Sequence, residues 1–210
     1  MKSTIAFIIS GVIFCAVTLS ATSSSKWQIT LRNRQFIPPS GIDADLRQTL
    51  QTATVFPIHG IVQLYKMASK DDRQSLRAYG VHLRQHLGGT AYLTEFSNKV
   101  SFATLTNNLV RWAGLLLPED KTEKSLWQGK IEDWAKTQAG KVRVIAEFHP
   151  YVSEDEAQKI LTKYTPTLHR FNYNFQWAIE IAPQNVKALA AEQSIEWLRQ
   201  GPDGYRPLTL

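Results

Sequence analysis

The sequence predicts an α+β protein made of two tandem units, each with the element order β-α-β-β-α-β. Two observations carry this prediction. Short segments with alternating apolar residues are interleaved with segments whose apolar residues recur at helical spacing. The same order of elements also occurs twice, about 84 residues apart, so that Ile61, Ser69 and Trp112 correspond to Val144, Ser153 and Trp197. We therefore expect two ferredoxin-like units, each an antiparallel sheet with its helices on one face.

Each expected unit begins with an apolar strand, residues 61–65 or 144–148, and continues into a helix. Ser69 and Ser153 are followed by acidic residues and fit the N-cap position, the second as a full capping box with Glu156. The first helix ends at Gly80. Pro166 stops the second helix, because the residue before a proline avoids helical geometry.

Two strands joined by a turn follow in each unit. Gly88-Gly89 precedes an expected strand at 91–96, and Asn172-Tyr173-Asn174 precedes one at 175–181. A second helix comes next, capped by Ser97 in the first unit and begun near Pro183 in the second. A tryptophan-containing strand closes each unit. The opposite face of each sheet receives no helix, so we expect it to be bare and available to a partner.

The N-terminal segment has the order typical of a secretory signal peptide. Lys2 precedes an apolar run from Ile5 to Leu19, and small residues follow as far as Ser25. An uncleaved anchor is the weaker alternative, because a membrane span needs about 20 apolar residues. We expect a secreted protein, extracellular or periplasmic, with no membrane attachment after cleavage.

Cysteine usage narrows the chemistry further. Cys15 is the only cysteine, it lies inside the apolar run, and Phe14 before it argues against lipidation. The chain beyond the expected signal peptide has no cysteine, and this excludes disulfides, thiol catalysis and cysteine-ligated metal there.

The expected organisation has six segments. They are a signal peptide at 1–25, an N-terminal extension at 26–57, the first unit at 58–117, a linker at 118–140, the second unit at 141–202 and an extended C-terminal tail at 203–210.

Charge gives no indication of nucleic-acid binding. The formal net charge is +6, and the chain without its first 25 residues carries 23 basic and 18 acidic residues. The basic residues are scattered, with no tract denser than Arg32-Asn33-Arg34. Nucleic-acid binding favours a concentrated stripe, so we interpret this charge as an ordinary soluble surface.

The sequence contains no convergent set of reactive groups. His82 and His86 are four residues apart and share a strand face, but without a nearby acidic or cysteine partner we interpret them as two exposed strand histidines. Acid pairs such as Asp71-Asp72 and Glu119-Asp120 fit turns and helix starts. Hydrolase, metalloprotease and phosphate-loop motifs do not occur. We therefore expect no catalytic residues, no cofactor and no metal.

One family resemblance bears on function. The run "FPIHGIVQLYKMASKDDRQSLRAYGVHLRQHLGGTAYLTEF" and the later "LVRWAGLLLPEDK" resemble the N-terminal prodomain region of secreted subtilisin-like serine proteases. The positions that carry it are His59, Val62-Gln63, Asp72-Arg73, Gly80-Val81, Ala91-Tyr92-Leu93 and Val110 to Gly114. The second unit is similar to the further prodomain-like repeat of that group. Together the resemblance spans about residues 27–202, without the peptidase domain that would follow.

The resemblance implies a non-catalytic binding protein. Such prodomains lay an open sheet against the protease and place their C-terminal tail in the active-site cleft, where an extended peptide gains main-chain hydrogen bonds. The tail residues expected to do this are Tyr205, Arg206, Pro207, Leu208, Thr209 and Leu210. Leu210 would fill the primary pocket and leave no peptide bond to cut.

The expected function is therefore inhibition of a subtilisin-like serine protease or assistance with its folding. Two alternatives remain open at this point. The chain could be an extracellular structural or interaction module that kept the duplicated fold, or the product of a truncated subtilisin-like protease gene. A frayed tail is the simplest interpretation of the last residues if no partner exists.

Overall fold

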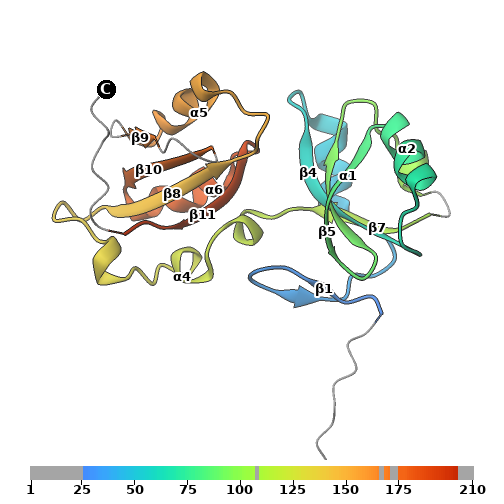
Figure 1. Ribbon diagram of the computed structural model, residues 1–210, viewed down its shortest axis with the longest axis horizontal. Coiled ribbons are helices and arrows are strands. Elements are labelled where there is room, and N and C mark those ends of the chain that lie inside the picture. The colour runs from blue at the N-terminus through green and yellow to red at the C-terminus, as the bar shows by residue number, and fades with distance from the viewer. Residues whose placement is uncertain (1–25, 107–108, 166–167, 171–174, 203–210) are drawn as a thin grey trace, which may run out of the picture.

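The computed structural model describes residues 26–106, 109–165, 168–170 and 175–202 (Figure 1). The expected signal peptide, the turn at 172–174 and the tail residues from Tyr205 to Leu210 lie outside the described residues. Within them the protein is α+β, as predicted, with two larger, mainly antiparallel sheets, a small N-terminal hairpin and short helices.

Four of the five strands of the first larger sheet come from residues 58–115, and the fifth, from residues 41–42, is described below. These four strands have the order β7-β4-β6-β5, and all of these neighbours are antiparallel. The elements are β4 (Ile58–Leu64), α2 (Lys70–Ala78), β5 (Val81–Gly88), β6 (Ala91–Phe96), α3 (Phe102–Leu105) and β7 (Val110–Leu115). The turn between β5 and β6 is the predicted one, and Gly88 and Gly89 both have positive φ, of 101° and 55°.

The second larger sheet, from residues 142–200, repeats this arrangement. Its strand order is β11-β8-β10-β9, again antiparallel throughout, so that the last strand lies beside the first in both units. The elements are β8 (Val142–Phe148), α5 (Glu154–Leu161), β9 (Leu168–Arg170), β10 (Gln176–Ile181), the 3₁₀ turn η3 (Pro183–Asn185), α6 (Val186–Ala191) and β11 (Ile195–Gln200).

The two units share one feature that the sequence analysis missed. Before the first unit, β3 (Gly41–Ile42) lies parallel to β7 and leads into α1 (Ala44–Thr52). Before the second, Thr122 forms a parallel bridge with Leu198 of β11 and leads into α4 (Lys124–Trp127). The backbone N–H that follows donates to the closing strand in both places, from Asp43 to Ala113 at 2.9 Å and from Glu123 to Leu198 at 2.7 Å. The structural repeat therefore begins earlier than the sequence pattern does.

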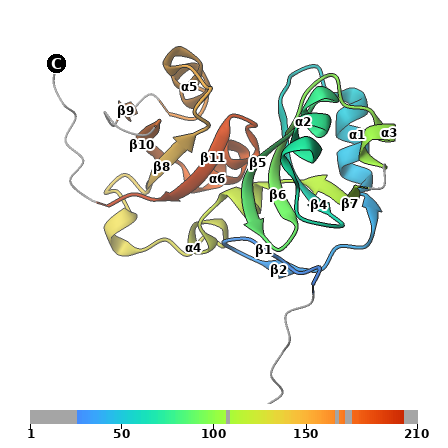
Figure 2. The ribbon, with the colours of Figure 1, turned by 45° about the vertical axis from the view of Figure 1, so that its right-hand side comes forward.

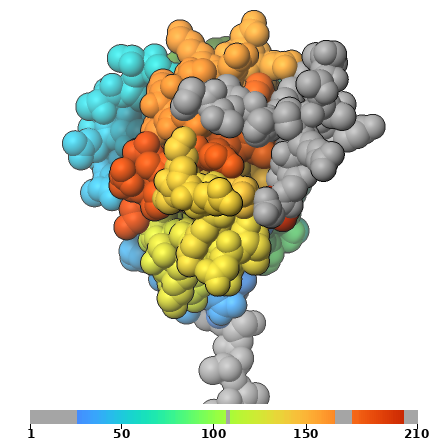
Figure 3. Space-filling view, turned by 90° about the vertical axis from the view of Figure 1, so that its left-hand side faces the viewer, coloured from blue at the N-terminus to red at the C-terminus, as the bar shows by residue number. Residues whose placement is uncertain are grey.

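Each unit has its own apolar core between its sheet and its helices. In the first, Val62, Tyr92 and Phe96 point to the helix side and are fully buried. In the second, Val144, Ile179 and Leu198 do the same. The connection between the units adds Leu126 and Ala135 to the second core, through α4 and the 3₁₀ turn η2 (Asp133–Ala135). Figure 3 shows this connection, in yellow, packed against the second unit.

The expectation of two bare sheet faces is wrong for the first unit. Its outer face carries Ile61, Ala91 and Trp112, and the N-terminal hairpin of β1 (Ile29–Thr30) and β2 (Gln35–Phe36) covers them (Figure 2). The Phe36 ring meets the Trp112 ring edge to face, with 5.7 Å between centroids. A sheet that is apolar on both faces must be covered on both, and these strands are apolar on both.

Helix capping differs from the prediction in two details. The full capping box is formed by Ser69 and Asp72. The Ser69 hydroxyl accepts from the Asp72 N–H, and the Asp72 carboxylate accepts from the Ser69 N–H. Ser153 does accept from the Glu156 N–H, but the Glu156 carboxylate lies 3.5 Å from the Ser194 hydroxyl. The residue that caps α3 is Ser101, not Ser97.

Candidate functional site

The most unusual polar cluster in the described residues lies where the two units meet. We call it the joint, and define it as His59, Glu95, Lys121, His149 and Tyr151. His59 and Glu95 come from the paired strands β4 and β6. His149 and Tyr151 follow the end of β8, and Lys121 ends the 3₁₀ turn η1 (Pro118–Lys121) that leaves the first unit.

Three aromatic rings are stacked in the joint. The His59 and His149 ring centroids are 3.8 Å apart and the ring planes differ by 8°. The Tyr151 ring is almost parallel to both, at 6.0 Å from His59 and 5.6 Å from His149. The Tyr151 hydroxyl lies 3.1 Å from His59 Nε2, which links the two units by a hydrogen bond.

Both imidazoles are buried and incompletely hydrogen-bonded. His59 is 2 % exposed and His149 is 5 % exposed. His59 Nδ1 and His149 Nε2 have no hydrogen-bond partner. Burial lowers the pKa of His59 to about 4, although Glu95 opposes this shift. Burial, reinforced by His59 and Lys121, lowers the pKa of His149 to about 3, so both rings are neutral at pH 7.

Carboxylates and cations surround the stack. Glu95 Oε1 is 3.8 Å from His59 Nε2, and Arg84 of β5 pairs with the same carboxylate. Glu196 Oε2 is 3.9 Å from His149 Nδ1, and burial raises the pKa of Glu196. Burial also lowers the pKa of Lys121 to about 8.

A half-open cleft of about 420 Å³ adjoins the stack. Arg84, Leu93, Glu95, Tyr151 and Glu196 contribute to its wall, together with the two histidines. The partnerless nitrogens are buried away from solvent, so they are not presented to a ligand in this cleft.

The stack is also unsuited to hold a metal ion. An imidazole binds a metal through a lone pair in its ring plane, and one ion cannot lie in two separate parallel planes. Among the described residues, no group of three or more potential ligands has the geometry of a metal site.

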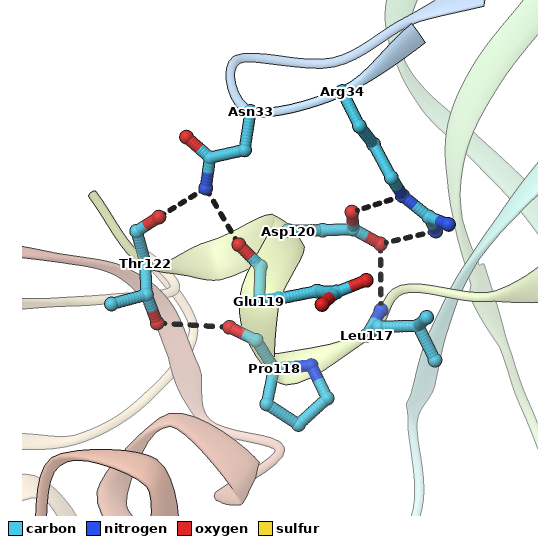
Figure 4. A network of polar contacts seen from close by, with 7 residues as sticks. All are labelled: Asn33, Arg34, Leu117, Pro118, Glu119, Asp120 and Thr122. Carbon is cyan, nitrogen blue, oxygen red and sulfur yellow. Dashed lines mark hydrogen bonds and ion pairs between the residues drawn. The ribbon is translucent and has the colours of Figure 1, made fainter. Parts of the chain in front are cut away.

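A second polar network fastens the N-terminal hairpin to η1 (Figure 4). Arg34 donates two hydrogen bonds to Asp120, at 2.7 and 2.9 Å, and the Asp120 carboxylate is fully buried. Asp120 also accepts from the Leu117 N–H at 3.0 Å. The Asn33 amide donates to the carbonyls of Glu119 and Thr122. These contacts, which we call the hairpin clamp, hold the connection between the units against the first unit.

The second sheet differs from the first in the chemistry of its outer face. Its outward residues include two ion pairs, between Arg143 and Glu180 at 3.5 Å and between Arg199 and Glu147 at 3.4 Å. All four side chains are between 23 and 38 % exposed. Figure 1 shows these strands in front of α6. This face combines the paired charges with Ile145, Ala178 and Trp197, and Arg32 of the hairpin segment lies 4.3 Å from the Trp197 ring centroid, whereas the outer face of the first sheet is largely apolar and covered.

The histidines singled out from the sequence lie outside the joint. His86 is exposed on β5, as expected, but His82 is half-buried. The expectation that they share a face through regular alternation is wrong, because β5 has an irregular register between Leu83 and His86. Asp120 lies in the first turn of η1, as expected for an acid at a turn or helix start, and it is also the buried centre of the hairpin clamp. No sequence signal marked His59 and His149 as neighbours, because they occupy non-equivalent positions in the two units.

Comparison with known proteins adds one finding. Residues 30–117 match the model of a family described as a domain of unknown function, DUF8729. This range takes in most of the N-terminal hairpin and the whole first sheet. No curated protein and no solved structure matches the chain. In the described part of the chain, every helix is too short or too polar to cross a membrane.

Proposed function

We propose that this chain is a secreted, non-catalytic binding protein that engages a subtilisin-like serine protease as an inhibitor or folding chaperone. The proposal is carried by the outer face of the second sheet, which has partly exposed ion pairs. The last strand of the unit, β11, forms one edge of this sheet. The resemblance of the sequence to protease prodomains supplies the class of partner. A non-catalytic role is consistent with the joint, where the titratable side chains contact one another.

The strand order supports a pair of tandem ferredoxin-like units. Both sheets place the closing strand beside the first strand and the third strand beside the second. Both also carry one helix after the first strand and another after the third. A duplicated β-α-β-β-α-β unit gives this order.

The difference between the two outer faces favours the second unit as the binding unit. The N-terminal hairpin already occupies the corresponding face of the first sheet. On the second sheet, Glu147, Arg199 and Gln176 form an outward polar group over the buried side chains of Ile145 and Ala178. A partly exposed layer of paired charges suits a polar protein surface better than a lipid or an apolar peptide.

The C-terminal segment supplies the second half of the proposed interaction. β11 ends at Gln200, two residues before the segment 203–210. We propose that Tyr205 to Leu210 enters the protease cleft as an added strand, with Leu208 and Leu210 in alternate pockets. The first unit and the joint then act as a scaffold for the second unit.

Inhibition kinetics test this proposal. The full chain, a version lacking residues 205–210 and the variant Arg199→Glu are titrated against a subtilisin-type protease. We expect inhibition at micromolar concentration, a loss of at least about tenfold in affinity without the tail, and a weaker loss for Arg199→Glu. Arg77→Glu, on the exposed face of α2, is the matched charge-reversal control and leaves inhibition unchanged.

The outcomes separate the parts of the proposal. Absence of inhibition by the full chain, together with absence of any gain in refolding yield of the protease, would overturn it. Equal inhibition with and without residues 205–210 removes the tail from the mechanism. If Arg199→Glu and Arg77→Glu change inhibition equally, the outer face of the second sheet takes no part in binding.

A further inference from the structure

We propose that the joint is an acid-sensitive latch: acidification separates the stacked His59 and His149 rings and lets the second unit swing away from the first, while each unit stays folded. This inference does not depend on the identity of any protease. It rests on the position of the two rings, which come from different units and form a direct aromatic contact between them.

In the closed joint, some buried polar atoms make no hydrogen bond. Two imidazole nitrogens, one on each ring, are buried without a partner. A buried polar atom without a partner is costly compared with the same atom in water. Opening the joint exposes both nitrogens to water or to a proton, so the stack resists protonation only while it remains closed.

The charges around the rings strengthen this dependence on protonation. Two protonated rings 3.8 Å apart would repel each other, and buried Lys121 adds a third positive charge close by. Arg84 acts in the same direction on His149.

Two carboxylates act against opening, but one is already paired with an arginine and the other is partly exposed to solvent. Glu95 favours a charged His59 but is paired with Arg84, and Glu196 is 3.9 Å from His149 and 44 % exposed. Tyr151 and Gln193 are neutral partners of His59, and Glu156 of α5 faces Tyr151. Burial outweighs these opposing groups for both histidines.

The direction of the pH effect follows from the lowered values. A histidine whose pKa is depressed in the closed form stabilises closure above its open-form pKa of about 6.5, and this contribution is lost as the pH falls below that value. With a closed-form pKa of about 4 for His59, the opening equilibrium shifts roughly 30-fold between about pH 7.5 and about pH 5. If both rings titrate, the shift approaches about 1000-fold.

The hairpin clamp supplies the pivot. It contains no histidine, and it ties η1 to the first unit through the bonds that Arg34 makes to Asp120. Lys121, the next residue, donates to the Glu192 carbonyl of the second unit at 2.7 Å. The clamp therefore keeps η1 attached to the first unit while the ring stack separates, and Lys121, itself a member of the joint, is the residue through which η1 meets the second unit.

Amide hydrogen exchange, followed by NMR on the full chain, measures this opening directly. The His59 N–H is bonded across the joint to the Gln193 side chain, at 3.4 Å, so it reports on separation of the units. The Val62 N–H, in the same strand but inside the core, reports on unfolding of the first unit. After correction for intrinsic exchange rates, we expect His59 protection to fall by more than the roughly 30-fold that His59 alone would give, toward about 1000-fold, between about pH 7.5 and about pH 5, with Val62 protection little changed.

Variants identify the titrating groups. His149→Phe keeps an aromatic ring in the stack without a titratable nitrogen and reduces the pH effect to that of His59 alone. The double variant His59→Phe/His149→Phe abolishes it. His86→Gln removes an exposed histidine that lies outside the joint and leaves the effect unchanged.

Four results would each overturn the proposal. These are an unchanged protection of His59, an equal fall at Val62, a full pH effect in His149→Phe, and a full pH effect in the double variant. Should the double variant fail to fold, imidazole titration in the unmodified chain decides: midpoints near the ordinary value of about 6.5 for both joint histidines, with the rings still in contact, refute the latch.

Discussion

The hairpin clamp gives the sharpest test of how the connection between the units is held. We consider Asp120→Asn, which keeps the size of the side chain and one acceptor oxygen for the Leu117 N–H. The substitution removes the charge that Arg34 binds through two hydrogen bonds at 2.7 and 2.9 Å. Because the Asp120 carboxylate has no solvent exposure, water cannot replace it as a partner of Arg34 within the closed network.

The expected loss follows from the burial of the two partners. Breaking a fully buried ion pair costs about 3 to 5 kcal/mol, but the Arg34 side chain is 33 % exposed and recovers part of its solvation. We therefore expect a loss of about 2 to 3 kcal/mol in the free energy of unfolding. For a chain of this size, that loss corresponds to a fall in Tm of about 5 to 10 °C.

Urea denaturation and thermal melting, followed by far-UV circular dichroism, measure this loss. Asp133→Asn is the matched control, because Asp133 also pairs with a basic side chain, Lys136 at 2.7 Å, but is 96 % exposed. We expect the control variant to have the same Tm as the unmodified chain. If the two variants lose the same stability, the buried network does not hold the connection and the assignment of a clamp is wrong.

Three further substitutions test the packing, the capping and the buried charge. Gly60→Ala adds a Cβ 2.6 Å from the Phe96 ring and against the Gly114 backbone, so we expect a loss of at least about 2 kcal/mol in the free energy of unfolding, measured in urea. Ser69→Ala breaks the capping box of α2 and lowers the same free energy by about 1 kcal/mol, while a fall of less than a few tenths contradicts the role of the cap. Lys121 has a pKa lowered to about 8, so the folded chain loses this proton before the unfolded chain does and gains about 2 kcal/mol between pH 7 and about pH 9.5. Urea titrations at both pH values show this gain in the unmodified chain, and a gain of the same size in Lys121→Met excludes Lys121 as its source.

Most of the element order could be predicted from the sequence because its causes are local. The short apolar runs of β4, β6 and β8 predict strands, and Ser69 and Ser153 with the acidic residues that follow them predict helix starts. The glycine pair at 88–89 fixes a turn for the same reason. Each of these signals depends on residues within a few positions of one another.

The covering of the first sheet and the joint were decided only by the tertiary structure. Ile61 and Trp112 are apolar on the outer face, but the sequence pattern did not reveal that Ile29 and Phe36 of the hairpin would cover them. His59 and His149 lie 90 positions apart and belong to no common period, so only the packing of one folded unit against the other places their rings in contact. Burial then sets their chemistry, because an imidazole is an ordinary titrating group in water and a neutral one when its surroundings exclude water.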